Sequence, residues 1–151
     1  MIVPMTKDHL PEVLAIEIAS FHDPWPLVSF YDVTEEPYVS WVALEEGRVI
    51  GYLVTLWVLD ELHVLNIAVQ ANMRRRGVGK QFVEFLLEKA SAEGIRMIYL
   101  EVRISNHAAI EFYRKAGFQY SYRRKAYYDD GEDAWMMERC TSEENVPKYE
   151  N

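Results

Sequence analysis

The 151-residue chain has one cysteine, Cys140, which excludes an internal disulfide and leaves too few thiolates for a metal cluster. Positive charge is also scarce, since 16 Lys and Arg stand against 24 Asp and Glu and give a formal net charge of −8. Phosphate affinity needs a surplus of basic residues, so this balance disfavours a general nucleic-acid binder. A cytoplasmic location is the expectation.

Long apolar runs are missing as well. The longest stretch without a charged residue or histidine, from Val49 to Leu59, falls short of the roughly 20 residues that a bilayer-spanning helix needs. The first residues include Asp8 and Glu12 and lack the apolar core of an export signal. No membrane segment is therefore expected.

Half of the residues are hydrophobic, and a chain of this length can bury a substantial core. We expect a single domain over residues 1–140 and a flexible, polar C-terminal tail over 141–151. The order of the expected elements is β-α-α-β-β-β-α-β-α-β-β, which predicts an α/β fold with a mixed sheet and helices on both faces.

Local patterns support these elements. The spacing of apolar residues predicts a helix over 8–20 whose buried stripe is Leu10, Val13, Leu14, Ile16 and Ile18. Prolines 24 and 26 end that helix, and a short second helix follows. Further helices are predicted at 77–92 and from 105 or 106 to 117. Strands are predicted at 2–6, 38–45, 48–59, 62–69, 96–102, 118–128 and 134–140, with tight turns at Glu46-Gly47 and at 129–133.

The stretch "NIAVQANMRRRGVGKQF", residues 66–82, concentrates positive charge where a strand gives way to a helix. Its glycines permit close backbone approach, and the N–H groups and dipole of the helix favour an anion. The spacing does not fit a Walker A loop, because Arg74 and Gln81 stand where Gly and Ser or Thr are needed. It does not fit the Rossmann pattern either, because Phe82 replaces the third glycine. A phosphate-binding loop of another kind is indicated.

This stretch resembles the cofactor motif of the Gcn5-related N-acetyltransferases (GNAT), Arg/Gln-x-x-Gly-x-Gly/Ala, through Arg74, Gly77 and Gly79. The similarity continues in "FHDPWP", "LEVRISNHAAIEFYRKAGF" and "RRKAYYDDGEDAWMM", so that it covers nearly all of residues 1–139. It is strongest to the RimI branch, which acetylates protein N-termini, and to its archaeal Ard1-like relatives. One departure is Ala71, where the family commonly has proline.

The resemblance implies a mostly antiparallel central sheet that is splayed between its two parallel strands. It also implies acetyl-CoA as co-substrate, with no metal. The strand before the loop would run beside the pantetheine arm, and the Val69 N–H would stabilise the oxyanion. The cofactor-binding residues implied are Ile67, Ala68, Val69, Arg74, Arg75, Arg76, Gly77, Val78, Gly79, Lys80 and Asn106.

Two residues are candidates for proton transfer. Glu101 ends the predicted strand at 96–102, where a partly desolvated carboxylate can act as general base; pairing with Arg103 is the alternative. Tyr113, on the following helix, can protonate the departing sulfur, and packing beside Phe112 is the alternative. Asn106 is expected to cap this helix in addition to contacting the cofactor.

The expected acceptor amine is the one with the larger neutral fraction at pH 7. At pH 7 an α-amino group is roughly 10 % neutral and a lysine side chain about 0.04 % neutral, so a chain N-terminus is the easier nucleophile. The RimI likeness likewise implies a protein N-terminus, of a ribosomal protein or of nascent chains. The predicted substrate-binding residues are Phe21, Trp25, Tyr127, Tyr128 and Glu132. For each of them, the alternative is a structural role in core packing or in a solvated turn.

Two other functions stay open. A small-molecule amine acetyltransferase on the same fold would have a closed polar pocket, and a non-catalytic CoA-binding module would need neither Glu101 nor Tyr113. The four histidines have no metal-ligand spacing, which favours structural roles for them.

Overall fold

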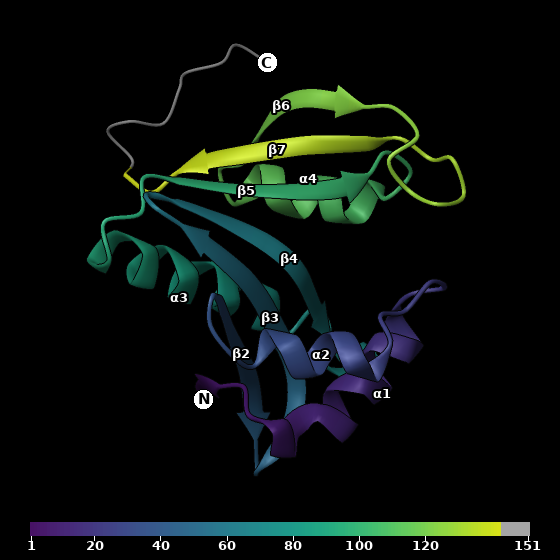
Figure 1. Ribbon diagram of the computed structural model, residues 1–151, viewed down its shortest axis with the longest axis vertical. Helices are drawn as coiled ribbons and strands as arrows, with labels where there is room; N and C mark the ends of the chain where they lie inside the picture. The colour runs from purple at the N-terminus through teal and green to yellow at the C-terminus, as the bar shows by residue number, and fades with distance from the viewer. Residues whose placement is uncertain (143–151) are drawn as a thin grey trace. The chain divides into compact units, whose positions relative to one another are not determined.

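The computed structural model describes residues 1–142, which form two compact units (Figure 1). The first unit comprises Met1–Val58 and Val64–Phe85, and the second comprises Leu59–His63 and the described chain from Leu86. Strand β4 (Glu61–Val69) and helix α3 (Val78–Ala92) contribute residues to both. Most of the predicted tail, residues 143–151, lies outside the described residues.

The first unit contains strands β1 (Ile2–Pro4), β2 (Tyr38–Glu45), β3 (Arg48–Val58) and the later part of β4, in that spatial order. Both β1 and β3 pair antiparallel with β2. Glu46 and Gly47, at φ of 51° and 77°, form the two-residue turn between β2 and β3, as predicted. Two consecutive left-handed residues give the backbone twist that suits a tight hairpin.

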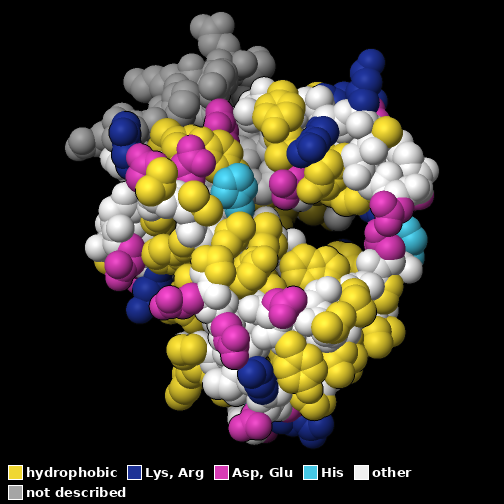
Figure 2. Space-filling view, viewed as in Figure 1, with side chains coloured by type: hydrophobic (Ala, Val, Ile, Leu, Met, Phe, Trp, Pro, Cys, Tyr) yellow, Lys and Arg dark blue, Asp and Glu magenta, His cyan; other side chains and the backbone are white. Residues whose placement is uncertain are grey.

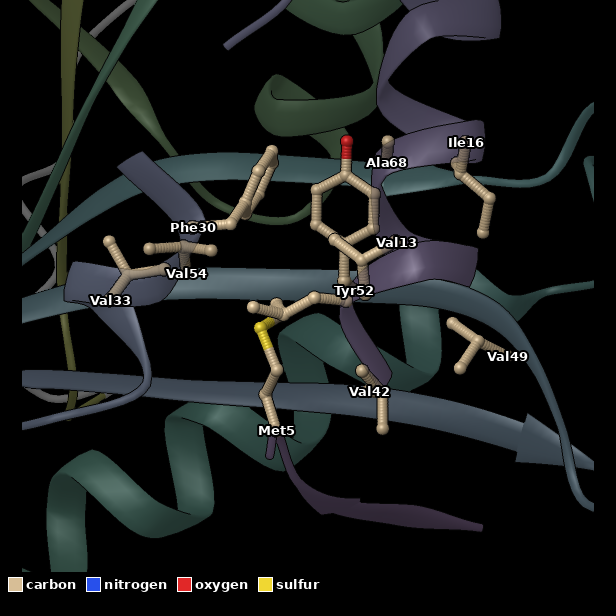
Figure 3. Packing of buried hydrophobic residues seen from close by; sticks show 11 residues of the cluster. Met5, Val13, Ile16, Phe30, Val33, Val42, Val49, Tyr52, Val54 and Ala68 are labelled. Atoms are coloured by element: carbon tan, nitrogen blue, oxygen red, sulfur yellow. The ribbon is translucent and has the colours of Figure 1, made fainter. Parts of the chain in front are cut away.

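Helices cover both faces of this part of the sheet. On one face, α1 (Leu10–Ser20) and α2 (Leu27–Val33) pack on the strands, and Val13, Phe30 and Tyr52 lie in one buried cluster (Figure 3). The neighbouring residue Gly51 points to the opposite face, because successive strand residues alternate. There a Cβ on Gly51 would lie 3.0 Å from the Phe82 ring of α3.

The buried stripe of α1 differs from the prediction at its C-terminal end. Ile18 is 59 % exposed, whereas Glu17 is 1 % exposed. Glu17 follows Leu10 by seven residues, about two turns, and so lies on the same helix face, while Ile18 is rotated a further 100° or so. Ile18 is predicted to be buried because it is hydrophobic, but the helical period places the Glu17 carboxylate on the buried face instead.

The second unit contains the start of β4, then β5 (Met97–Arg103), β7 (Ala134–Cys140) and β6 (Gln119–Arg124), in that order. The Asp60 carbonyl accepts hydrogen bonds from the N–H groups of Arg96 (2.7 Å) and Met97 (3.4 Å), so β4 and β5 begin side by side and run parallel. β7 pairs antiparallel with both β5 and β6. The predicted mixed sheet with a parallel pair is confirmed.

Helix α4 (His107–Lys115) lies between the predicted N-cap residue and the glycine predicted to close it. The Asn106 side-chain oxygen accepts a hydrogen bond from the Ala109 N–H at 3.2 Å, so Asn106, and not Ser105, is the cap. Gly117, at φ of 93°, follows the helix.

The connection between β6 and β7 is longer than predicted. The Asp133 carboxylate accepts hydrogen bonds from the Ala126 N–H (2.8 Å) and from Arg123 Nε (2.7 Å), and Ala126 adopts a left-handed φ of 51°. This arrangement ends the strand at Arg124. The predicted strand to residue 128 is therefore wrong, and Tyr127 and Tyr128 lie in a loop over residues 125–133.

Crowding at Gly51 generates a stability prediction. In Gly51→Val the side chain would meet both the Ala68 carbonyl oxygen and the Phe82 ring at about 3.0 Å. We expect a loss of about 1–3 kcal/mol in the free energy of unfolding, measured by urea denaturation. The control Ser121→Val adds the same side chain at an exposed strand position and should change stability by less than about 0.5 kcal/mol. Equal stability of the two variants would contradict the packing described.

Candidate active site

The basic loop, which we define as residues 70–80, comprises the connection from β4 to α3 and the first three residues of α3, all in the first unit. It contains a short 3-10 turn (Ala71–Met73), then Arg75 and Gly77 with left-handed φ of 66° and 83°. The first intrahelical bond runs from the Gln81 N–H to the Gly77 carbonyl at 2.9 Å. The N–H groups of the first helical residues consequently have no intrahelical acceptor, which is the arrangement that binds anions.

The arginines of this loop do not all have the same surroundings. Arg74 donates to the Val69 carbonyl (3.1 Å) and to Ser20 Oγ (3.2 Å) at the end of α1. Arg76 pairs with Glu45 at 3.3 Å. These contacts hold the loop against the rest of the unit. A role for Arg74 and Arg76 in anion binding stays a prediction.

The strand before the loop is the predicted binding strand for the pantetheine arm. Ala68 is buried in the hydrophobic cluster, whereas Ile67 and Val69 are half-buried, as expected for residues that alternate between two faces. At its end, the Gln70 N–H donates to the Ile50 carbonyl at 2.8 Å. The role of the Val69 N–H as oxyanion donor stays a prediction.

A cavity of about 670 Å³ lies beside the basic loop in the same unit. Its lining comes from α1, from the turn between β2 and β3 with the adjoining strand ends, and from the first part of the loop, up to Arg74. The predicted phosphate-binding residues from Arg75 to Lys80 do not line it. The cavity is thus a feature separate from the helix N-terminus.

A buried polar cluster that was not predicted from the sequence is made by Glu17, Trp25, Tyr52 and Asn66, and we call it the Glu17 cluster. Glu17 Oε1 accepts hydrogen bonds from Asn66 Nδ2 (2.7 Å) and the Tyr52 hydroxyl, and Oε2 accepts one from the Trp25 N–H (2.8 Å). Burial, together with the Glu17 carboxylate, raises the pKa of Tyr52. The signal that could have revealed this cluster is a glutamate on the apolar face of a helix.

The predicted substrate residues of this unit lie between α1 and α2. Trp25 is half-buried and its ring lies 5.4 Å from that of Phe30, so part of it packs on the core. Phe21 is exposed. Figure 2 shows hydrophobic side chains on the surface over α1 and α2, and the exposed ones are Ile18, Phe21, Leu27, Val28 and Tyr31.

In the second unit, Glu101 lies on β5 opposite Met136 of β7. Arg139, three residues further along β7, donates to the Ala116 carbonyl at the end of α4. Strand residues alternate, so Glu101 faces away from α4. Burial raises the pKa of its half-buried carboxyl group, and the charges of His63 and Arg124 partly oppose this.

Tyr113 is buried on α4, with its ring 5.3 Å from Phe112 and 5.6 Å from Phe118. Burial raises the pKa of its phenol, which therefore stays protonated at neutral pH. The ring thus packs in an aromatic group, as the alternative interpretation expected, while the hydroxyl keeps the proton that an acid role requires.

The loop over residues 125–133 brings two predicted tyrosines toward these groups. Burial and the Glu101 carboxylate raise the pKa of Tyr127. Burial raises the pKa of Tyr128 to about 12, with Glu101 contributing and Arg103 opposing. The Tyr128 phenol also contributes to the raised pKa of Tyr113, after burial. The Glu101 carboxylate therefore acts on both loop tyrosines, and of these two only Tyr128 also acts on Tyr113.

Glu132 anchors this loop. Its carboxylate accepts a hydrogen bond from the Ser105 N–H (2.9 Å) and pairs with Arg103 (2.9 Å), whose guanidinium lies 4.0 Å from the centre of the Tyr128 ring. Both carboxylate oxygens contact the protein itself. A direct role for Glu132 in substrate binding stays a prediction, and the contacts seen are those of a loop anchor.

Among residues 1–142, no helix is both long and apolar enough to cross a membrane. The same residues contain no group of three or more His, Cys, Asp or Glu side chains arranged to hold a metal ion.

Comparison with known proteins places these residues in context. The sequence model of the Acetyltransferase (GNAT) family matches residues 10–118. The chain is 34% identical over 131 residues to the [ribosomal protein bS18]-alanine N-acetyltransferase of Escherichia coli (strain K12), covering 85% of this chain and 88% of that protein. It is 30% identical over 146 residues to the N-alpha-acetyltransferase of Saccharolobus solfataricus, covering 87% of each. The crystal structure of the Escherichia coli ribosomal-protein-S18-alanine N-acetyltransferase matches with a TM-score of 0.88, 32% identity and 99% coverage of both chains.

The loop anchor generates a second prediction. The hydrogen bond from Ser105 and the pairing with Arg103 lower the pKa of Glu132. A group with a lowered pKa stabilises the folded loop above its ordinary pKa and loses this effect as the pH falls through the lowered value. The Ser105 amide should therefore stay protected from hydrogen exchange down to about pH 4, near the ordinary pKa of glutamate, and lose protection below it.

The matched variants are Glu132→Ala, which should speed exchange at Ser105 and across residues 125–133, and Asp129→Ala, an exposed neighbour that should not. The measurement is amide exchange by mass spectrometry or NMR. Unchanged protection in Glu132→Ala would remove Glu132 as the anchor.

Proposed function

The chain belongs to the acetyltransferase (GNAT) family and is an acetyl-CoA-dependent N-acetyltransferase, and we propose that its acceptor is the N-terminal α-amine of a ribosomal protein. The observation that carries the proposal is the half-buried Glu101 carboxylate, whose pKa is raised by burial. A base of this kind suits an amine that is already partly neutral near pH 7, as a chain N-terminus is. The names of the Escherichia coli and Saccharolobus relatives support the same acceptor class.

The basic loop has the features needed to hold the pyrophosphate of acetyl-CoA. The N-terminal N–H groups of α3 point to an anion site, and Gly77 adopts the left-handed backbone that brings the chain into the helix. Arg75 and Lys80 are exposed beside it. Ile67, Ala68 and Val69 would contact the pantetheine arm, and Asn106 would contact the cofactor while capping α4.

The bound acetyl-CoA supplies a thioester that the amine attacks directly. In this proposal Glu101 takes the proton from the attacking amine, and the protonated Tyr113 donates one to the departing sulfur. The Val69 N–H stabilises the negative charge on the carbonyl oxygen. Cys140 is buried, and direct transfer requires no nucleophile from the protein.

The acceptor peptide would contact Phe21 and Trp25 of the α1–α2 loop and Tyr127 and Tyr128 of the loop after β6. Glu132 would act on the peptide indirectly, by holding Arg103 and Tyr128 in place. The proposal includes a cytoplasmic enzyme, since its substrate is ribosomal, and it assigns no membrane or nucleic-acid partner to the chain. Acetylation of a free small amine is the alternative, and it would require acceptors that lack a peptide chain.

The function is tested with purified protein, acetyl-CoA and a short peptide that begins with Ala and contains one lysine. We expect mass spectrometry to place one acetyl group on the N-terminal α-amine. A control peptide with a blocked N-terminus and a free lysine should remain unmodified. Labelling of the lysine, preferential turnover of small amines, or no turnover at all would contradict the proposal.

The catalytic base is tested with Glu101→Gln. Loss of a general base should lower kcat by about 10²–10⁴-fold, while the Kd for acetyl-CoA stays the same. The control is Glu111→Gln, an exposed position on α4 that should leave both values unchanged.

The pH profile gives an independent check on Glu101. The acidic limb of kcat/KM should lie above the ordinary range for glutamate, because burial raises this pKa. In Arg124→Gln the limb should move to still higher pH, since the Arg124 charge lowers the pKa of Glu101. If the acidic limb does not move, or moves to lower pH, Glu101 is not the group whose ionisation controls the rate.

A further inference from the structure

We infer that Glu17 is a positioning residue, whose buried carboxylate holds the α1–α2 loop on strand β4 and thereby sets the affinity for the acceptor peptide. The inference rests on the proposed function, because it takes the α1–α2 loop as part of the peptide-binding site. All the residues involved belong to the first unit.

Three chain segments meet at this carboxylate. The donors are the backbone N–H of Trp25 in the loop, the side-chain amide of Asn66 on β4 and the hydroxyl of Tyr52 on β3. Figure 3 shows the Tyr52 ring among the hydrophobic side chains, with its hydroxyl at the edge of the labelled group. Every donor approaches a group that is 1 % exposed, so solvent does not compete with these bonds.

Core stability alone does not account for a carboxylate at this position. The other buried residues of α1 are Leu10, Val13 and Ile16, and a further aliphatic side chain would cover the same face without the cost of burying a charge. What the carboxylate adds is directional. It specifies where the Trp25 backbone lies, in a loop that has no regular secondary structure.

The positions that Glu17 connects are those of the predicted site. Asn66 directly precedes Ile67–Val69, the predicted binding strand for the pantetheine arm. Trp25 and Phe21 are the predicted peptide contacts of this unit. One turn after Glu17, Ser20 accepts a hydrogen bond from Arg74 of the basic loop. The last turn of α1 thus contacts the peptide loop, the cofactor strand and the phosphate-binding segment.

Two substitutions of similar volume separate the hydrogen bonds from the charge. In Glu17→Gln the side-chain oxygen can accept from the Trp25 N–H, which cannot change its role. The amide of this glutamine can donate to the Tyr52 hydroxyl or to a flipped Asn66, because both of these groups can accept. In Glu17→Met the acceptor is lost altogether. The inference therefore expects Gln to preserve the position of the loop and Met to release it.

The kinetic readout is the KM for an N-terminal peptide compared with the KM for acetyl-CoA and with kcat. For Glu17→Met we expect a rise of about tenfold in the peptide KM, corresponding to one lost charge-assisted hydrogen bond, with acetyl-CoA KM and kcat within about threefold of wild type. Glu17→Gln should restore the peptide KM. The control Tyr52→Phe removes only the bond that leads to β3 and should leave the peptide KM within about twofold.

An unchanged peptide KM in Glu17→Met, or an equal rise for both substrates, would overturn the inference. So would a Gln variant as impaired as the Met variant. If Glu17→Met does not fold, Glu17→Met/Tyr52→Phe removes one of the unsatisfied donors and serves in its place.

A second measurement does not depend on activity or on folding of the variants. In the wild type, the Trp25 amide should exchange its hydrogen at least about tenfold more slowly than the same amide does in an unstructured peptide of this sequence. Exchange at the unstructured rate would overturn the inference. If the wild type acetylates no peptide, the proposed function fails; a slow Trp25 amide would then still support the anchoring by Glu17, and a fast one would refute it.

Discussion

The convergence of three hydrogen-bond donors on the Glu17 carboxylate is the constraint on which the arrangement of the first unit depends. A charge in an apolar cluster is tolerated only when its oxygens are satisfied, and here each donor comes from a different segment of the chain. The need to satisfy one buried group thereby determines the positions of a loop, a strand and a helix end relative to one another. Aliphatic packing is less directional and would permit these segments to shift.

The two buried or half-buried glutamates illustrate how surroundings assign different roles to one side chain. Three donors occupy Glu17, so its oxygens are committed to structure. Glu101 is half-buried on β5, where burial raises its pKa, and the charges of His63 and Arg124 and a backbone hydrogen bond partly oppose the effect. A carboxylate destabilised in its charged form is prepared to accept a proton. The same principle keeps the Tyr113 phenol protonated, because burial disfavours the phenolate.

Much of the fold could be predicted from local sequence. Successive left-handed residues at Glu46 and Gly47, the Asn106 cap and the change from strand to helix at the basic loop all depend on neighbours within a few residues. The errors arose where a specific side-chain contact or the helical period outweighs the preference of a single residue. Tyr127 and Tyr128 are residues that favour strands, but the Asp133 carboxylate accepts a hydrogen bond from the Ala126 N–H, and the chain turns before it reaches them. Ile18 is hydrophobic and yet exposed, because the helical period places Glu17 on the buried face.

The sequence by itself determined the order of the elements, the position of the basic loop and the identity of the candidate base, because periodicity, turn residues and motif spacing are local properties. Tertiary structure decided which charged side chains form hydrogen bonds or ion pairs with other groups of the protein. Arg74 contacts Val69 and Ser20, and Glu132 contacts Arg103 and Ser105, although both residues were predicted as ligand contacts. A pattern in the chain records the face on which a side chain lies. Its partner depends on which distant segment folds against that face, and only the packed structure contains that information.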